Sequence, residues 1–182
     1  CLTCGNEHLI QVLSDIYKDC PLTDAYRPKT NLRPKVYPIR LMLCTKCNNL
    51  QLANQVDPAE SYEGYEYKSA ITPKLIDSFV SYAKDCKNEL NNQDDLVLLD
   101  VGSNDGSFLV AAKDVGFTPY GIEPSSSHAE ACRENGLNVY NGYFEDDHSI
   151  PSDQKFDVIS FNNVLANMPE PENILITARK HL

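Results

Sequence analysis

From residue 96 to the last residue, strand-like and helix-like segments alternate, and this alternation limits the possible folds more than any other feature. Residues 96–101 form an apolar run typical of a strand buried on both faces. Helices are predicted over residues 107–115, 127–135 and 172–182, and the first two end at Gly116 and Gly136. Further strands are predicted at residues 120–122, 137–140 and 156–161. The alternation predicts an α/β fold with a parallel, doubly wound sheet.

The predicted sheet is smaller than usual. Only about four strands fit before Leu182, whereas open sheets of this class carry about five or six. The chain also begins with Cys1 rather than with Met. We therefore expect the sheet to be truncated and the chain to be a fragment of a longer protein.

An amphipathic helix is predicted immediately before the alternating region, over residues 73–90. Thr72 is its expected N-cap and Pro73 its first residue, and the polar run 91–95 ends it. The apolar positions follow the i, i+3, i+4, i+7 spacing of one helix face; they are Leu75, Ile76, Phe79, Val80, Ala83, Cys86 and Leu90.

The first 58 residues differ in character from the rest of the chain. They are dense in proline and have short strand-like runs at 36–43 and 50–53, but no long helical pattern. Four of the seven cysteines form two pairs there, Cys1-x-x-Cys4 and Cys44-x-x-Cys47. In a reducing compartment such pairs are metal ligands more often than disulfides, although a redox pair or unliganded thiols are alternatives. We predict a metal-binding module over 1–58, a linker and helix over 59–95, and a ligand-binding domain over 96–182.

Acidic side chains are concentrated in the C-terminal part. The net charge is −10, made up of +1 over residues 1–60 and −11 over residues 61–182. Such a surface repels a phosphate backbone, so we expect no nucleic-acid partner. No stretch approaches the roughly 18 uninterrupted apolar residues of a membrane-spanning helix, and the N-terminus lacks the layout of a secretory signal. We expect a soluble, cytoplasmic protein without a membrane partner.

The turn after the first predicted strand, residues 100–106, is the first candidate ligand site. Gly102 and Gly106 allow the backbone to approach a ligand at the carboxyl end of the strand. Their Gly-x-x-x-Gly spacing differs from the Gly-x-Gly-x-x-Gly of dinucleotide sites. Asp100 and Asp105 would repel a pyrophosphate but attract a cation such as S-adenosylmethionine, which carries a sulfonium and an α-amino group and no phosphate.

Glu123 is the second candidate, because it directly follows the second predicted strand. An acidic residue at this place can accept hydrogen bonds from both hydroxyls of a ribose. The alternative is a solvated turn residue before Pro124.

Several segments, taken together and in order, resemble the zinc-binding-domain class of S-adenosylmethionine-dependent methyltransferases. They are the cysteine pairs with the run 37–52, Tyr65-Glu-Tyr67-Lys-Ser69, the loop 100–106 and Phe161-Asn-Asn-Val-Leu-Ala166. The best understood members of the class are C-methyltransferases that act on nucleotide-linked keto-deoxysugars. The resemblance extends over nearly all 182 residues. It implies a small Cys4 zinc module over 1–58 and an incomplete Rossmann-like class I methyltransferase sheet, which binds S-adenosylmethionine, over 96–182. The family continues into a second, C-terminal domain, and we expect that domain to be missing from this chain.

The resemblance also implies site residues. It implies that one structural Zn²⁺ is bound by Cys1, Cys4, Cys44 and Cys47. Glu123 would hold the ribose of S-adenosylmethionine, and the methionine part would lie against Asp100, Gly102, Asn104 and Gly106. Phe144 would stack on the adenine or belong to the core. Asn162 and Asn163 follow the last predicted strand, where they would meet cofactor and substrate or cap a helix.

Tyr65 and Tyr67 resemble family tyrosines near the active site and are the candidate catalytic residues, although both are also suited to pack a domain junction. The implied reaction removes a proton from a carbon next to a ketone, and the enolate then attacks the methyl group of the sulfonium. Asn167 stands where family members often carry His or Glu, and an amide does not shuttle protons at neutral pH.

Three functions are therefore weighed. The first is an S-adenosylmethionine-dependent C-methyltransferase, or its N-terminal portion, for a sugar nucleotide or similar small molecule. The second is a non-catalytic cofactor-binding or zinc-stabilised interaction module. The third is a nucleotide-sugar or NAD-dependent oxidoreductase, which the glycine spacing and the acidic loop disfavour.

Overall fold

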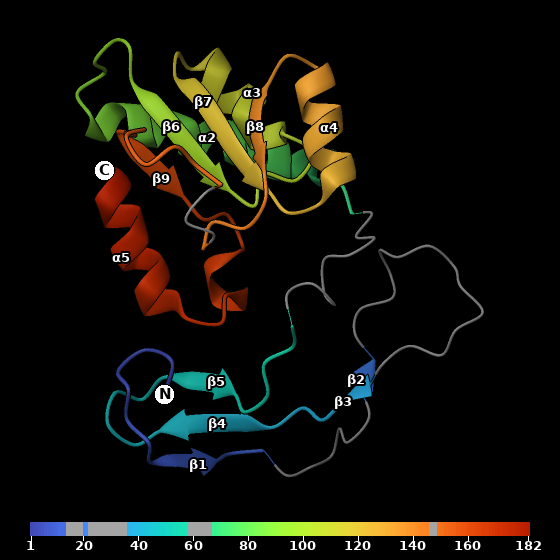
Figure 1. Cartoon of the computed structure of the whole chain (residues 1–182), viewed down its shortest axis with the longest axis vertical. Helices are drawn as coiled ribbons and strands as arrows, with labels where there is room; N and C mark the ends of the chain where they lie inside the picture. The colour runs from blue at the N-terminus through green and yellow to red at the C-terminus, as the bar shows by residue number, and fades with distance from the viewer. Residues whose placement is uncertain (14–19, 22–35, 58–66, 146–148) are drawn as a thin grey trace. The chain divides into compact units, whose positions relative to one another are not determined.

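The computed structural model describes residues 1–13, 20–21, 36–57, 67–145 and 149–182 (Figure 1). The chain divides into two units: Cys1–Glu66 with Met168–Asn173, and Tyr67–Asn167 with Ile174–Leu182. Among the described residues, none of the helices has both the length and the apolar character needed to cross a membrane.

The first unit contains a small antiparallel sheet, in the order β1-β4-β5. Its strands are β1 (Leu9–Gln11), β4 (Leu41–Cys44) and β5 (Leu50–Leu52). A separate pair joins β2 (Cys20–Pro21) to β3 (Val36–Tyr37). The strand expected over 36–43 is thus two strands, β3 and β4, in different sheets. Pro38, which directly follows β3, has no N–H group and cannot continue a ladder of hydrogen bonds.

The second unit is built on a parallel sheet of four strands in the order β8-β7-β6-β9. The strands are β6 (Val97–Val101), β7 (Thr118–Glu123), β8 (Asn138–Asn141) and β9 (Val158–Ser160). This confirms the predicted α/β sheet. The chain adds β7 and β8 on one side of β6 and then returns to add β9 on the other side. Because the strand order reverses at β6, a ligand crevice is expected outside its carboxyl end.

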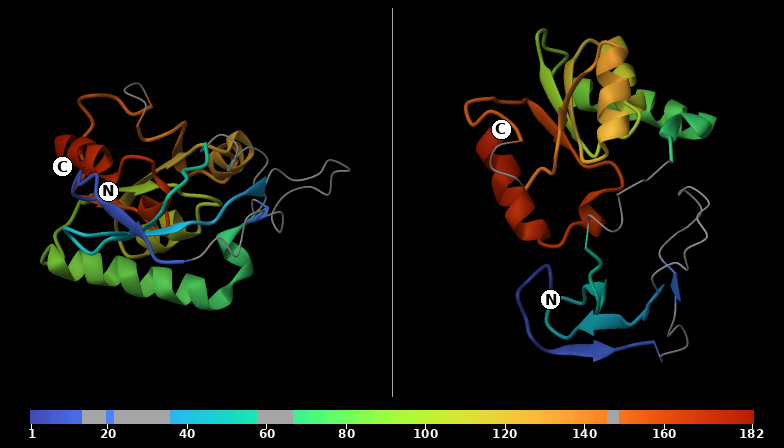
Figure 2. Two further views of the ribbon diagram at one scale, coloured as in Figure 1. Left: turned by 90° about the horizontal axis from the view of Figure 1, so that it is seen from below. Right: turned by 45° about the vertical axis from the view of Figure 1, so that its right-hand side comes forward.

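The helices of this unit are η2 (Ser69–Ile71), α2 (Pro73–Glu89), α3 (Ser107–Asp114), α4 (Ser126–Glu134), η3 (Leu165–Asn167) and α5 (Pro171–His181) from Ile174 onward. Helices α3 and α4 pack on the sheet and α2 packs on α3; Figure 2 shows the 17-residue α2 in green from two further directions. The apolar face predicted for α2 packs against α3, where the rings of Phe79 and Phe108 lie 5.4 Å apart. Thr72 occupies the N-cap position as expected, but its side chain makes no capping hydrogen bond.

One charged side chain lies in this helix interface. Lys87 of α2 is buried, with its ammonium group 3.2 Å from the carbonyl oxygen of Gly116 and 5.3 Å from the ring centre of Phe117. It therefore donates to a carbonyl just after the end of α3, where the helix dipole is negative. The charge is accommodated because both a carbonyl and a ring face lie beside it.

Replacing Lys87 with alanine should lower the free energy of unfolding of this unit by about 1.5–3 kcal/mol, since a charged hydrogen bond and its packing are lost. Urea denaturation followed by helical circular dichroism measures the effect. Lys84 lies on the same helix but is exposed, so Lys84→Ala is the control and should change the free energy by less than about 0.5 kcal/mol. Equal effects of the two substitutions would contradict the interpretation.

Candidate functional site

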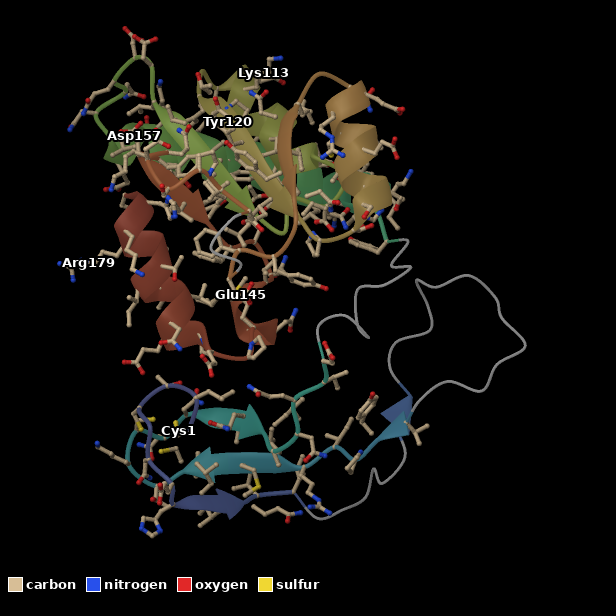
Figure 3. The ribbon with its side chains drawn as sticks, viewed as in Figure 1. Cys1, Lys113, Tyr120, Glu145, Asp157 and Arg179 are labelled. Carbon is tan, nitrogen blue, oxygen red and sulfur yellow. The ribbon has the colours of Figure 1, made fainter. Side chains whose placement is uncertain are left out.

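The four paired cysteines come together at one end of the β1–β4–β5 sheet. The antiparallel register of β1 and β4 places Leu9 opposite Cys44, and this returns the second pair to the first. Both pairs form the same turn: the N–H of Gly5 donates to Cys1 O, and that of Asn48 to Cys44 O. Gly5 and Asn48 have φ values of 65° and 59°, which glycine and asparagine tolerate. The two cysteine pairs therefore form two matching turns, or knuckles, that face each other. Figure 3 labels Cys1 in the first of them.

The sulfur positions suit a tetrahedral metal ion. All four Sγ atoms lie within 4.8 Å of one another, and Cys1–Cys47 and Cys4–Cys44 are 3.6 and 3.7 Å apart. Zinc bonded at about 2.3 Å to four thiolates requires edges of about 3.8 Å. The Cys47 N–H, then the Asn6 amide, lower the pKa of Cys44 to about 6 and so favour the thiolate that a metal binds. The cluster fits one structural Zn²⁺.

The loop between β6 and α3 is shaped by three residues with positive φ, namely Gly102, Asn104 and Gly106. The N–H groups of Gly102 and Ser103 both donate to Ile122 O, which anchors the loop to β7. The two glycines are needed because protein atoms crowd them: a Cβ on Gly102 would lie 2.6 Å from Val164, and one on Gly106 would lie 2.5 Å from Leu137. Ligand approach, which we predicted for both, stays a prediction.

Glu123 ends β7 beside this loop, and 6% of the residue is exposed. Its Oε2 accepts the N–H of Asn104 and its Oε1 that of Ser125, both at 2.8 Å. Burial raises the pKa of Glu123, while the two N–H donors lower it. Each oxygen retains an acceptor position, so the carboxylate can still bind two hydroxyl groups. Glu123 is not the solvated turn residue that we considered as the alternative.

Asp100 lies in β6 with a carboxylate that already has partners in the protein. Its Oδ1 accepts hydrogen bonds from Ser160 Oγ at 2.6 Å and Asn162 Nδ2 at 2.9 Å, and 2% of the residue is exposed. Burial raises the pKa of Asp100 to about 7, although both donors oppose the shift. Asn162 thus binds the end of β6 rather than capping a helix.

This shift predicts a pH dependence. Because the folded pKa of Asp100 is above its unfolded value of 3.8, the folded state binds the extra proton, and stability falls as pH rises from about 4 to about 7. The variant Asp100→Asn should not show this loss. Its free energy of unfolding should therefore rise relative to that of the wild type by about 2–3 kcal/mol as the pH is raised from 5 to 8. Urea denaturation at several pH values tests this. The exposed Asp114→Asn is the control, and a parallel pH profile for the two variants would refute the assignment.

The loop is also joined to the segment before α2. Asn104 Nδ2 donates to Tyr67 O at 2.9 Å, and Asn104 Oδ1 accepts the Ser69 N–H at 3.1 Å. Asp105 accepts the Ala70 N–H, and it also accepts from the N–H and the hydroxyl of Ser107 at the start of α3. Tyr67 is half-buried, whereas Tyr65 lies outside the described residues.

Phe144 and Asn163 are the remaining candidates of the donor site. Phe144 is buried, with its ring edge-to-face with Phe161 at 5.7 Å, and stacking on adenine stays a prediction. Asn163 has a φ of 58° and its carbonyl accepts from Asn167 Nδ2. Sequence reasoning missed Ser160, although a polar residue in the otherwise apolar strand 156–161 was a signal for it. It also missed the hydrogen bonds from Ser107, the first residue of α3, to Asp105.

Comparison with known proteins identifies the larger unit. Residues 74–182, more than half of the chain, match a family model described as "Methyltransferase domain". The chain belongs to the methyltransferase-domain family. Residues 1–62, which include both cysteine pairs, match a second model described as "Putative zinc binding domain". Among curated proteins, no match was found.

Solved structures similar to this methyltransferase-domain protein are themselves methyltransferases. The plantazolicin methyltransferase BpumL, in complex with a pentazolic desmethylPZN analog and SAH, is 16% identical with a TM-score of 0.54, over 69% of this chain and 50% of that one. BamL, with a triazolic analog and SAH, is 17% identical with a TM-score of 0.51, over 60% and 43%.

Magnesium protoporphyrin IX methyltransferase (ChlM) from Synechocystis PCC 6803, with bound SAM, is 15% identical with a TM-score of 0.48, over 70% of this chain and 60% of that one. The likeness to BpumL and BamL identifies a methyltransferase fold. This chain spans half or less of the length of those two proteins.

Proposed function

We propose that the chain is the donor-binding, zinc-stabilised portion of an S-adenosylmethionine-dependent C-methyltransferase. One observation carries the proposal: Glu123, a buried acid at the carboxyl end of β7, is hydrogen-bonded to the loop at the carboxyl end of the neighbouring strand β6. A ribose can bind Glu123 while the rest of the ligand lies along the loop. Family membership supports the same class of reaction.

The chemistry of the loop favours this donor over a dinucleotide. Asp100, Asp105 and Glu123 surround the loop, and none of the basic residues is bonded to the loop among the contacts of the described residues. A pyrophosphate placed there would be repelled by these carboxylates, whereas a sulfonium and an α-amino group would be attracted. Asp100 contributes less than its sequence position predicts, since its carboxylate is buried and its pKa is raised by burial.

When bound, S-adenosylmethionine supplies an electrophilic methyl group. The proposed acceptor is a carbon next to the ketone of a nucleotide-linked deoxysugar or similar small molecule. Tyr65 or Tyr67, as the phenolate, would take the proton from that carbon and become the phenol, and the electron pair left behind would form the new carbon–carbon bond as the sulfonium becomes a thioether. The choice of a sugar substrate and of the tyrosines depends on the resemblance of the sequence motifs. Alignment of the reacting atoms would supply most of the catalysis.

One observation favours a second candidate, a non-catalytic donor-binding module. Asn167 stands where related enzymes often carry a proton-transferring residue, and its amide donates to Asn163 O at 3.2 Å. An amide held in this way shapes the turn and transfers no proton.

Calorimetric titration with S-adenosylmethionine, S-adenosylhomocysteine and NAD separates these functions. The proposal expects both sulfur compounds to bind and NAD not to bind. Binding of NAD alone would falsify the methyltransferase assignment. Donor binding without methyl transfer to any nucleotide-linked ketosugar offered would favour the non-catalytic module.

A further inference from the structure

The loop proposed to hold the methyl donor is hydrogen-bonded to the segment that carries Tyr67. We call residues 67–71, which include η2, the strap. Asn104 bonds two backbone groups of the strap, at Tyr67 and Ser69, and Asp105 bonds a third, at Ala70. The contacts join residues 35 or more positions apart in the sequence, so the loop and the strap are held together by tertiary structure.

The chemistry of the strap requires an amide at position 104. The Ser69 N–H can only donate and the Tyr67 carbonyl can only accept, so the Asn104 oxygen must face Ser69 and its nitrogen must face Tyr67. An aspartate would place a second acceptor against the Tyr67 carbonyl. Asn104 also has a φ of 50°, a conformation that asparagine adopts more readily than most residues.

Asn104 is at the same time part of the proposed donor site. Its N–H donates to Glu123 Oε2 at 2.8 Å, and its carbonyl accepts from Cys132 Sγ at 3.4 Å. All four polar groups of this residue therefore have partners: the backbone bonds the donor site and α4, and the side chain bonds the strap. A ligand that binds Glu123 therefore acts on Asn104, whose side chain bonds the Tyr67 carbonyl.

We propose that Asn104 is a positioning residue that fixes Tyr67 against the methyl-donor loop and couples the strap to donor binding. The proposal rests on the proposed function and deepens it. The side chain of Asn104 bonds the strap, and its backbone N–H bonds Glu123 of the proposed donor site. The backbone of Tyr67 is thereby held by the same loop that holds the donor, and this limits where its phenol can lie relative to the methyl group.

Amide hydrogen exchange, resolved by residue, tests the positioning role without any activity assay. Asn104→Gly removes the side chain but retains the N–H and suits a positive φ. We expect the Ser69 amide to exchange at least about 10-fold faster in this variant than in the wild type. Asn92→Gly is the matched control, because Asn92 is exposed, has a φ of 52° and lies just after α2. Equal Ser69 exchange in the two variants would overturn the proposal.

Asn104→Asp separates the two bonds of the side chain. Its carboxylate can accept the Ser69 N–H but cannot donate to Tyr67 O, so Ser69 protection should be intermediate between the wild type and Asn104→Gly. Full wild-type protection in Asn104→Asp would show that the bond to Tyr67 contributes nothing and would count against the proposal.

S-Adenosylhomocysteine then tests the coupling. We expect it to slow Ser69 exchange in the wild type and not in Asn104→Gly, and it should bind that variant more weakly, because a ligand that stabilises the bonded strap is in turn bound more tightly by it. Binding that leaves Ser69 exchange unchanged in the wild type would overturn the coupling while the proposed function stands. Failure of the wild type to bind would refute the proposed function, and the ligand-free comparison would still decide the positioning role.

Discussion

Replacing both Cys44 and Cys47 with serine is expected to abolish zinc binding and to unfold the β1–β4–β5 sheet. Metal analysis should find about one zinc per wild-type chain and none in the variant, because two of the four thiolates are lost. Structural zinc contributes roughly 10–16 kcal/mol of binding free energy in small zinc modules, which far exceeds the stability of a short sheet.

The packing of this unit explains why the effect should be so large. Among its described residues at 1–13 and 36–57, Cys44 is the one buried residue, and Ile10, Leu50 and Leu52 are each about half exposed. So small a core cannot offset the conformational entropy of ordering the strands. The zinc ion therefore has to replace the core.

Cys86→Ser is the control, because it makes the same replacement at a cysteine outside the cluster. Cys86 packs beside the core of the larger unit, so its replacement should retain zinc and cost little stability. Circular dichroism and the amide spectrum of residues 1–57 report folding. A Cys44→Ser/Cys47→Ser chain that retains zinc, or that loses zinc yet keeps its amide spectrum, would contradict the structural role.

Replacing Glu123 with glutamine should weaken S-adenosylhomocysteine binding by about 10- to 100-fold, or roughly 1.5–3 kcal/mol. The substitution removes the charged acceptor proposed for the ribose. It also places an NH2 group against the N–H of either Asn104 or Ser125, both of which donate to the native carboxylate. The loop then loses one of its anchors as well.

Glu130→Gln removes the same charge from an exposed position on α4 and should leave the affinity within about 2-fold of the wild type. Calorimetry gives both affinities, and thermal unfolding shows how much of the effect comes from the lost loop anchor. Unchanged affinity in Glu123→Gln would remove Glu123 from the donor site.

Local patterns predicted most of the helices and strands of the larger unit. The helix expected over 73–90 occupies Pro73–Glu89, because Pro73 suits a first turn and the apolar spacing matches one helix face. Prediction was weaker in the first unit. β1 was missed because three residues carry little periodicity, and its partner β4 is some thirty residues away along the chain.

The same division holds for the candidate site. The cysteine pairs and the glycines of the loop are visible from spacing alone, since a knuckle and a turn are each made by neighbours in sequence. The bonds from Ser160 and Asn162 to Asp100 were not predicted, and they span 60 and 62 positions. Because of them, an acid expected to face the ligand is buried, with its pKa raised by that burial.

By itself, then, the sequence determined the order of strands and helices in the larger unit, the glycines of the loop and the two cysteine pairs, because these depend on short-range sterics, hydrophobic spacing and ligand chemistry. Only the tertiary structure decided which donor meets which acceptor: Asn104 with the strap, Glu123 with two N–H groups and Asp100 with β9. A side chain can bond any complementary group brought near it, and the folding of distant segments selects one.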